Sequence, residues 1–271
     1  MGGLGNQLFQ IFHTIAYALR TKQEFIFEYS DVLTTGVHRP TYWKTFLKKL
    51  MKYTTTKQLE YPIYREKQFH YKPINNNLHN IKFFGYFQTH KYFEGQYASI
   101  KDIIDLNTIR NKILKSYRAY FKDKDTISIH FRLGDYKNIQ DCYPLLDIQY
   151  YINALTKIMN TTKPDNFRVL FFCQKEDNKM VLDTINKLKQ EQIFQNVEFK
   201  KVSDKIPDWE QVLIMSLCNH NIIANSTFSW WGAYFNDNKD KIVCFPETWF
   251  GEKLQQNNTK DLCPNNWICI S

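Results

Sequence analysis

The sequence lacks any run of about 18 apolar residues, so it predicts no membrane-spanning helix. Its first ten residues, MGGLGNQLFQ, lack the basic and apolar regions of a signal peptide. It also lacks a tract of one charge sign, because the basic residues are scattered and the densest groups are pairs such as Lys48-Lys49. These absences predict a cytoplasmic protein with no integral membrane segment.

Cysteine is sparse and dispersed. The six cysteines include no Cys-x-x-Cys pair, which argues against a disulfide framework or a zinc cluster. Cys173 and Cys244 lie in apolar stretches typical of small buried side chains. Asp123 and Asp125 form an Asp-x-Asp pair that could hold a divalent cation, but they precede a strand among lysines, where a solvated turn is the simpler interpretation. The sequence therefore predicts no metal site.

The composition is that of a folded globular protein. Of the 271 residues, 43% are apolar and 23% are charged, so the chain can form one large domain or two smaller ones with full cores. The net charge of +9 and the pI near 9.1 suit an anionic ligand such as a nucleotide diphosphate. They also suit nucleic acid, a membrane surface or a simply solvated basic surface. The scattered basic residues favour the solvated surface and argue against nucleic acid.

Strands alternate with helices throughout the second half of the chain. This alternation predicts parallel β-α-β units and a Rossmann-like domain of the α/β class. After a first strand near residue 126, the expected elements are strands over 167–173, 197–202, 222–225 and 241–245, and helices over 150–159, 179–190, 208–217 and 228–235.

The first half predicts fewer regular elements. No Gly-, Ser- or Pro-rich linker separates the halves, and the charged turn at 121–125 is the best boundary. The sequence therefore predicts one domain over 1–124 and a second over 125–271. The elements expected in the first domain are a helix after residue 7, strands over 24–29 and 81–84, and helices over 43–53 and 94–120.

The stretch Thr126–Tyr136, TISIHFRLGDY, combines a strand with charged side chains at its end. Two isoleucines alternate with polar residues, the pattern of a strand with one buried face. His130, Arg132 and Asp135 follow at the carboxyl end, where ligands bind in open α/β sheets. The alternative is a strand-to-loop turn with a surface Arg–Asp pair.

A second stretch, Asn219–Phe235, reads NHNIIANSTFSWWGAYF. An apolar strand leads into Asn225, Ser226 and Thr227, which can cap the helix that follows. Hydroxyls and backbone N–H groups at a helix amino end, beside a strand's carboxyl end, form a phosphate-binding geometry. An ordinary helix cap is the alternative, and the two tryptophans are expected in the core.

Glycines also precede the first helix, in Gly2–Gln7, GGLGNQ. Such a loop leaves N–H groups able to face an anion at the helix amino end. A dinucleotide-binding interpretation would add Glu28, about 20 residues on, as the ribose-binding acid. Two features oppose it, since Leu8 stands where the third glycine of that motif belongs and no strand precedes the loop.

Four segments of the chain resemble one family, the α-1,2-fucosyltransferases. They are GGLGNQLFQ at 2–10, GYFQTHKYF at 85–93, HFRLGDY at 130–136 and NSTFSWWGAYF at 225–235, and PNNWICI at 264–270 resembles the end of that family. The resemblance spans essentially the whole chain. It implies a GT-B fold, with two Rossmann-like halves facing each other across a cleft. It also implies GDP-β-L-fucose as donor, a glycan acceptor, and no metal or other cofactor.

The resemblance also implies roles for individual residues. Arg132 matches the arginine expected on the donor diphosphate, where a planar, permanently charged guanidinium suits phosphate oxygens. His130 matches the histidine expected near guanine, and Asp135 matches the acid of the motif. The other matching positions are the phosphate-facing helix cap, Ser226, Thr227 and Ser229, and the glycine-loop residues expected to face across the cleft, Asn6 and Gln7.

Three departures from the family pattern bear on activity. Leu133 stands where most members carry a second arginine, and Gln211 stands where members often carry an aspartate. Residues 173–175, Cys-Gln-Lys, replace a Ser-Asp-Asp-like segment. Leu133, Gln211 and the lack of a strand before the glycine loop motivate an alternative, a non-catalytic glycan- or nucleotide-binding protein derived from a transferase.

The resemblance implies inverting transfer of L-fucose to a sugar hydroxyl, with an α-1,2 linkage to galactose or a similar sugar. Inversion in one displacement places the acceptor on the opposite face of the fucose ring, where a general base can take its proton. Asp135 is the first candidate for this base and Asp141 the second, unless the transition state needs none. The sequence indicates neither the acceptor nor the oligomeric state.

Overall fold

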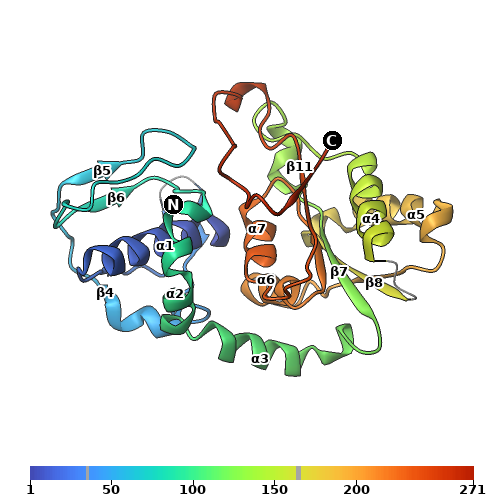
Figure 1. Cartoon of the computed structure of the whole chain (residues 1–271), viewed down its shortest axis with the longest axis horizontal. Helices are drawn as coiled ribbons and strands as arrows, with labels where there is room; N and C mark the ends of the chain where they lie inside the picture. The colour runs from blue at the N-terminus through green and yellow to red at the C-terminus, as the bar shows by residue number, and fades with distance from the viewer. Residues whose placement is uncertain (35–36, 163–165) are drawn as a thin grey trace. The chain divides into compact units, whose positions relative to one another are not determined.

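The structure is a computed structural model that describes residues 1–34, 37–162 and 166–271 (Figure 1). It contains a six-stranded parallel sheet together with helices, so the predicted α/β class is confirmed. Within the described ranges, no helix combines the length and the apolar character needed to cross a membrane.

The chain forms two compact units. The first comprises residues 1–111 and 257–264, and the second comprises residues 112–256 and 265–271. The sequence placed its boundary after residue 124 instead, at the charged turn. That turn belongs to the second unit, where Arg168 Nη1 donates to Lys122 O at 3.3 Å and so binds the turn to a strand of the sheet.

The second unit is built on one fully parallel sheet. The strand order is β12-β11-β10-β7-β8-β9. From β7 the chain proceeds outward to β9, then returns to the other side of β7 and proceeds through β10 to β12. The order therefore reverses between β7 and β10, which makes this the switch point where ligands bind in such sheets. The strands are β7 (Asp125–His130), β8 (Phe167–Phe172), β9 (Glu198–Lys201), β10 (His220–Ile222), β11 (Val243–Pro246) and β12 (Ile268–Ile270).

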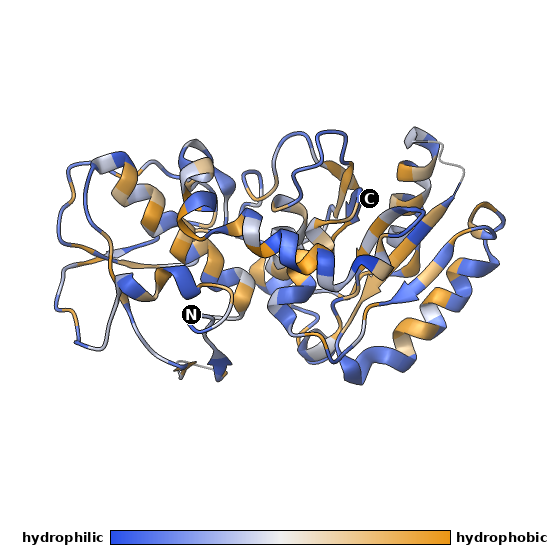
Figure 2. Cartoon of the chain, turned by 90° about the horizontal axis from the view of Figure 1, so that it is seen from below, coloured by the Kyte–Doolittle hydropathy of each residue, from blue (hydrophilic) through white to orange (hydrophobic). Residues whose placement is uncertain are grey.

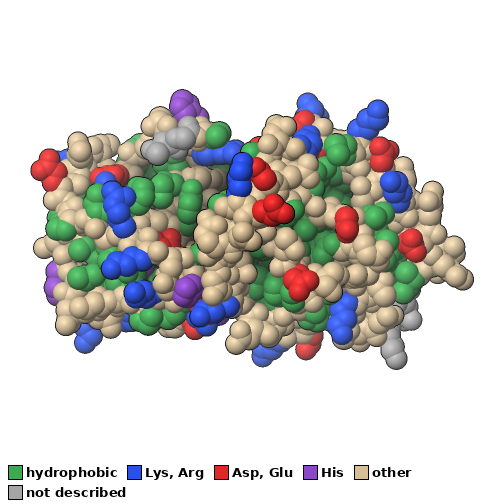
Figure 3. Space-filling model, turned by 90° about the horizontal axis from the view of Figure 1, so that it is seen from above, with side chains coloured by type: hydrophobic (Ala, Val, Ile, Leu, Met, Phe, Trp, Pro, Cys, Tyr) green, Lys and Arg blue, Asp and Glu red, His purple; other side chains and the backbone are tan. Residues whose placement is uncertain are grey.

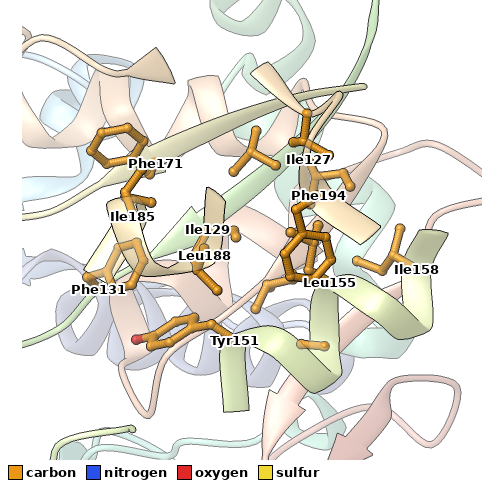
Figure 4. Close-up of a cluster of buried hydrophobic side chains, with 14 of the residues drawn as sticks. Ile127, Ile129, Phe131, Tyr151, Leu155, Ile158, Phe171, Ile185, Leu188 and Phe194 are labelled. Atoms are coloured by element: carbon orange, nitrogen blue, oxygen red, sulfur yellow. The ribbon is translucent and has the colours of Figure 1, made fainter. Parts of the chain in front are cut away.

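Helices cover both faces of this sheet. The helices α4 (Ile148–Thr162) and α5 (Asn178–Gln190) lie on one face, and α6 (Asp208–Ser216) and α7 (Thr227–Tyr234) lie on the other (Figure 1). The helices α4 and α5 combine buried apolar residues with polar ones, a mixture visible along the helices of Figure 2 and expected for helices with one buried side. Figure 4 shows the resulting core, in which side chains of β7 and β8 meet those of α4 and α5.

The alternation along β7 separates its packing face from its functional face. Ile127 and Ile129 are fully buried in the core beside α4 and α5. The intervening Ser128 and His130 point to the opposite face because successive strand residues alternate. There the Asn221 Nδ2 group donates to Ser128 Oγ at 2.7 Å. The period of two in the sequence thus delivers His130 to the side of the sheet that α7 covers.

The first unit contains α1 (Leu4–Thr21), α2 (Tyr97–Ile103) and the start of α3 (Leu106–Ser116). Its strands form three two-stranded pairs rather than one continuous sheet. Each strand is two or three residues long, so the sequence showed only part of this pattern. The pairs are β1 (Phe27–Glu28) with β4 (Thr54–Thr55), β2 (Val32–Leu33) with β3 (Arg39–Pro40), and β5 (Ile63–Arg65) with β6 (Lys82–Phe84).

Two helices expected in the first half are altered. The helix predicted over 94–120 is interrupted between α2 and α3, because Asp105 has a φ of +59°, a left-handed conformation that ends a helix. Aspartate tolerates this conformation better than most residues do. The helix predicted over 43–53 is a 3-10 helix over Lys48–Tyr53.

The segment 257–264 joins the first unit through a buried carboxylate. The Asp261 side chain accepts a hydrogen bond from Tyr71 N at 3.1 Å and from Lys91 Nζ at 2.5 Å. Asp261 is itself buried. Charge-assisted hydrogen bonds are stronger than neutral ones. They therefore help to hold this segment in the first unit, although the residues before and after it belong to the second.

Candidate functional site

The two stretches singled out in the second half of the sequence meet at the switch point. His130 ends β7 and Ser229 lies in the first turn of α7, and His130 Nδ1 is 2.9 Å from Ser229 Oγ. Both residues are buried. A contact between residues so distant in the sequence depends on β7 and β10 being neighbouring strands. The sequence did not predict this pairing.

Burial keeps His130 uncharged. Desolvation, assisted by the nearby Arg132 charge, lowers its pKa to about 3. The Ser229 hydroxyl also accepts the Ala224 N–H at 3.2 Å. Ser229, predicted to face a phosphate, is thus engaged in a buried network that connects β7, the end of β10 and α7. This geometry gives Ser229 a role in orienting His130.

Arg132 is held on three sides. Its Nη1 group donates to Gln174 Oε1 at 2.9 Å, and its Nη2 group forms an ion pair with Asp135. The guanidinium lies over the Tyr136 ring, 4.6 Å from the ring centroid. Gln174 belongs to the segment that departs from the family pattern. An arginine fixed in this way loses little conformational freedom when it binds an anion.

The turn after β7 is fastened by a buried aspartate that the sequence analysis missed. Asp177 accepts from Gly134 N at 2.8 Å and from Lys137 Nζ at 2.8 Å. Gly134 has a φ of +40°, which favours glycine, and a Cβ there would lie 1.9 Å from Gln174 Oε1 and displace the side chain that binds Arg132. Asp177 follows β8, the strand beside β7, and this position at a strand's carboxyl end was the available signal.

Tyr136 connects the same turn to the entry of α7. Its hydroxyl donates to Asn225 O at 3.2 Å, and its ring stacks on Tyr143 at 4.7 Å. Burial raises its pKa to about 12, so the hydroxyl keeps its proton. Tyr136 lies within the motif from which His130 and Arg132 were chosen, but its aromatic side chain was assigned no role.

The amino end of α7 is an N-cap. Ser226 has extended backbone and its hydroxyl accepts the Phe228 N–H at 3.3 Å. Thr227 is half-buried at the first helical position. Trp230 and Trp231 are fully buried, so the expectation that they belong to the core is confirmed. The cap places hydroxyls and the positive end of the helix dipole beside His130.

Two motifs of the first unit also meet. The Gln88 Nε2 group, in the GYFQ segment, donates to Asn6 Oδ1 at 2.8 Å. Gln7 is buried, and its Nε2 group donates to Gly2 O at 3.0 Å and to Pro40 O at 2.9 Å. Gln7 therefore holds the glycine loop in place, whereas Asn6 is coupled to Gln88.

The GYFQ segment is held in a strained conformation. Phe87 has a φ of +53°, unusual for a bulky residue. The Glu66 carboxylate accepts the backbone N–H groups of Tyr86, at 2.7 Å, and of Phe87, at 3.0 Å. His13 stacks on the Phe87 ring with centroids 3.9 Å apart. Strain of this kind persists only where the surroundings hold it, and it is common at functional sites.

Replacing His13 by phenylalanine should make the free energy of unfolding less dependent on pH. His13 is fully buried, its ring nitrogens have no hydrogen-bond partner among the described residues, and burial lowers its pKa to about 3. The unfolded chain binds a proton below its ordinary pKa of 6.5 that the folded protein excludes, so stability falls as the pH drops from that value towards 3.

Urea unfolding at about pH 7.5 and about pH 5 measures this effect. The loss of stability between the two pH values should be about 2 kcal/mol smaller in His13→Phe than in the wild type. His79→Phe, at an exposed position of the same unit, should leave the loss unchanged. Equal pH dependence in wild type and His13→Phe would show that His13 does not titrate in this way.

Acidic residues away from the His130 and Arg132 side chains have other partners. Asp141, the second candidate base, is exposed and forms an ion pair with Lys253. Asp125 begins β7, at the opposite end of the strand from His130, and Asp123 is an exposed neighbour of Lys122. Among the described residues, no three His, Cys, Asp or Glu side chains are arranged to hold a metal ion. Metal independence stays a prediction.

The departures from the family pattern have definite positions. Leu133 is partly buried against the core that α4 and α5 share with the sheet. Gln211 lies in α6, and its Nε2 group donates to Ile206 O at 2.8 Å. The neighbouring Glu210 accepts from the Tyr117 hydroxyl. Leu133 therefore packs against the core, and Gln211 forms a hydrogen bond to the backbone of a loop, at positions where charged side chains were expected.

Known proteins resemble the chain in sequence. The family described as glycosyl transferase family 11 matches residues 2–271. An alpha-1,2-colitosyltransferase of Escherichia coli is 27% identical over 209 residues, which cover 76% of this chain and 68% of that protein. The O-antigen biosynthesis glycosyltransferase WbnK of Escherichia coli is also 27% identical over 209 residues, which cover 73% and 65%. The chain thus spans about two thirds of the length of these relatives.

Two solved structures share low identity with the chain. The α-1,6-fucosyltransferase NodZ soaked with GDP-fucose is 15% identical, with 85% of this chain and 88% of that chain covered and a TM-score of 0.47. POFUT1 in complex with GDP is 13% identical, with 90% and 96% covered and a TM-score of 0.47. At these scores neither structure supplies residue roles for this chain.

Proposed function

Because the chain belongs to glycosyltransferase family 11, we propose that it transfers L-fucose from GDP-β-L-fucose to a sugar hydroxyl. The product would carry an α-1,2 linkage to galactose or a similar sugar. The observation that carries this proposal is the meeting of His130 and the Arg132 turn with the amino end of α7 at the switch point of the sheet. An arginine beside a helix amino end is suited to a diphosphate.

In this proposal the second unit stabilises the leaving group. Negative charge grows on the β-phosphate of GDP as its bond to fucose breaks. Arg132 and the positive end of the α7 dipole would oppose that charge, with the Ser226 and Thr227 hydroxyls as further donors. Since Gln174 already orients Arg132, little reorganisation would be needed during the reaction. Neutral His130 would accept a hydrogen bond from the guanine base of GDP, or donate one to it, without adding charge.

On the acceptor side, Asp135 is proposed as the general base. The glycine-loop residues Asn6 and Gln7 of the first unit stay predicted substrate-binding residues. Asp135 is half exposed and pairs with Arg132. Arrival of the donor diphosphate would give Arg132 a new anionic partner and release the Asp135 carboxylate. Asp135 could then take the proton of the acceptor hydroxyl. The same ion pair also suits a second role, in which Asp135 only braces Arg132.

Asp135→Asn separates these two roles. We expect it to lower kcat by about 10²-fold or more while the Kd for GDP stays within about twofold of the wild type, because a general base contributes to the chemical step alone. Steady-state kinetics and calorimetric GDP titration measure the two quantities. Asp141→Asn is the matched control and should keep its activity. If Asp135→Asn lost GDP affinity with little further loss of kcat, Asp135 would be a brace.

A donor and acceptor screen tests the proposed function. Purified protein would receive GDP-fucose or GDP-mannose with a panel of galactosides and other sugars, and product linkage would be determined by NMR. Acceptor-dependent release of GDP from GDP-fucose, with an α-1,2-linked product, is expected. Tight GDP-fucose binding without a product on any acceptor would instead support the alternative, a non-catalytic binding protein.

A second donor is favoured by one observation, the colitosyltransferase name of a relative 27% identical. Colitose is L-fucose without its 3-hydroxyl, so a site for one sugar needs few changes to accept the other. Including GDP-colitose in the screen distinguishes them. If kcat/KM were at least tenfold higher with GDP-colitose than with GDP-fucose, colitose would be the transferred sugar. The proposed transfer mechanism would be unchanged.

A further inference from the structure

The β5–β6 pair turns one face to the core of the first unit and the other to solvent. The strand register pairs Ile63 with Lys82 and Arg65 with Phe84, so these four side chains share the solvent face. Solvent-facing strand positions ordinarily carry polar residues. Here an aliphatic and an aromatic residue alternate with two basic ones.

Exposed apolar side chains gather on this face. Ile63 is 50% exposed, Phe84 is 42% exposed, and Tyr61 and Tyr86 beyond the strand ends are each 40% exposed. The Arg65 guanidinium lies over the Phe84 ring, 4.5 Å from its centroid. We call Ile63, Arg65, Lys82 and Phe84 the outer β5–β6 face, which Tyr61 and Tyr86 flank in the sequence. Single exposed apolar residues are ordinary, but several on one short strand pair mark an interaction surface.

The charge of the chain is concentrated in the same unit. The first unit holds 16 of the 36 Lys and Arg residues but only 9 of the 27 Asp and Glu residues, so it carries +7 of the net +9. Acidic side chains are correspondingly sparse over this unit in the space-filling view (Figure 3). Arg65 and Lys67 are both exposed where β5 ends. A partner of the outer β5–β6 face therefore combines apolar and anionic groups.

We propose that the outer β5–β6 face docks on a lipid bilayer that contains anionic phospholipids. The aromatic and aliphatic side chains enter the headgroup region, and Arg65 and Lys67 contact phosphate groups. Aromatic side chains with a polar end suit this boundary. This inference goes beyond the proposed transfer reaction and does not depend on it.

Two other partners fit the face less well. A second copy meeting it through the same surface would bring two units of +7 together, which opposes association. A nucleic acid needs several basic groups along its backbone, whereas Lys82 on this face is bonded to Glu28 at 2.7 and 2.9 Å. The Ile63 side chain has no charge or hydrogen-bond donor that could bind a phosphate. A bilayer surface accepts both the apolar and the cationic side chains.

Vesicle flotation of the full chain tests the proposal. Vesicles of phosphatidylcholine alone and of phosphatidylcholine with about 30% phosphatidylglycerol would be compared at low and high salt. The wild type should float with the anionic vesicles, and binding should weaken at high salt. The double variant Ile63→Ser/Phe84→Ser and the single variant Arg65→Glu should each bind about tenfold less.

Met180→Ser/Leu182→Ser is the matched control, since both residues are similarly exposed in the second unit, and it should bind as the wild type does. Circular dichroism and thermal unfolding would establish that each variant is folded. Three results would overturn the proposal: no flotation of the wild type, equal loss in the control variant, or a wild-type dimer in light scattering that only the outer-face variants dissociate. Tighter binding to a duplex oligonucleotide than to vesicles, lost in the same variants, would also overturn it.

Discussion

Replacing Arg132 by alanine should reduce transfer from GDP-fucose by about 10³-fold, the largest effect expected from any single substitution in this chain. The guanidinium is a strong positive charge placed at the switch point by β7, and Leu133 beside it supplies no second charge. Without Arg132 the growing charge on the leaving diphosphate would be opposed by the α7 dipole and the Ser226 and Thr227 hydroxyls, none of which carries a full positive charge. The measurement is the initial rate of product formation with saturating acceptor.

The fold should survive this substitution. Arg132 contacts Gln174, Asp135 and Tyr136 beyond the carboxyl end of β7 and is absent from the hydrophobic core cluster. Arg132→Lys keeps the charge without the planar fork, and we expect it to recover only part of the activity. Arg118→Ala, at an exposed arginine of the same unit, is the control. Near-wild-type turnover in folded Arg132→Ala would refute the assignment of Arg132 to the diphosphate.

Asp177→Ala should have the second largest effect, on stability and activity together. The substitution leaves the partly buried Gly134 N–H without its acceptor and Lys137 without its carboxylate. Loss of two bonds to a charged group should lower the free energy of unfolding by about 2–3 kcal/mol. The turn that carries Arg132 and Asp135 would lose its anchor, and kcat/KM should fall by about 10- to 100-fold.

Asp177→Asn refines this test, because an amide oxygen can still accept the Gly134 N–H. We expect it to recover most of the stability and part of the activity. Asp183→Ala, at an exposed position of α5, should change neither quantity. Urea unfolding and donor-dependent kinetics provide the readouts. A loss of stability in Asp177→Ala with kinetics intact would mean that the turn holds Arg132 without this carboxylate.

Local patterns were enough to predict much of the second unit. The period of two over residues 126–130 predicted β7, and helical spacing predicted α4, α5 and α6, because both signals arise from which side of one element is buried. β12 was not predicted. Its three residues, Ile268–Ile270, are too few to show a period, and it exists because β11 offers a pairing edge.

The first unit was predicted less well for the same physical reason. Its paired strands are two or three residues long, and pairing partners such as Phe27 and Thr54 are far apart in the chain. Neither residue signals the other in sequence. The positive φ of Asp105, which interrupts the long predicted helix, is likewise a property of the packed chain around the buried Leu106.

By itself the sequence determined which residue types are available for chemistry: an arginine and a histidine at the end of one strand, hydroxyls at the start of one helix, and a glycine loop. These follow from local spacing, and four motifs in order linked them to a family. Only the tertiary structure decided their use. The parallel order of β10 and β7 brings Ser229 to His130, and the loop after β8 supplies Gln174 and Asp177 to the Arg132 turn. Such contacts depend on strand order, which arises from packing the whole sheet and is not encoded in any one segment.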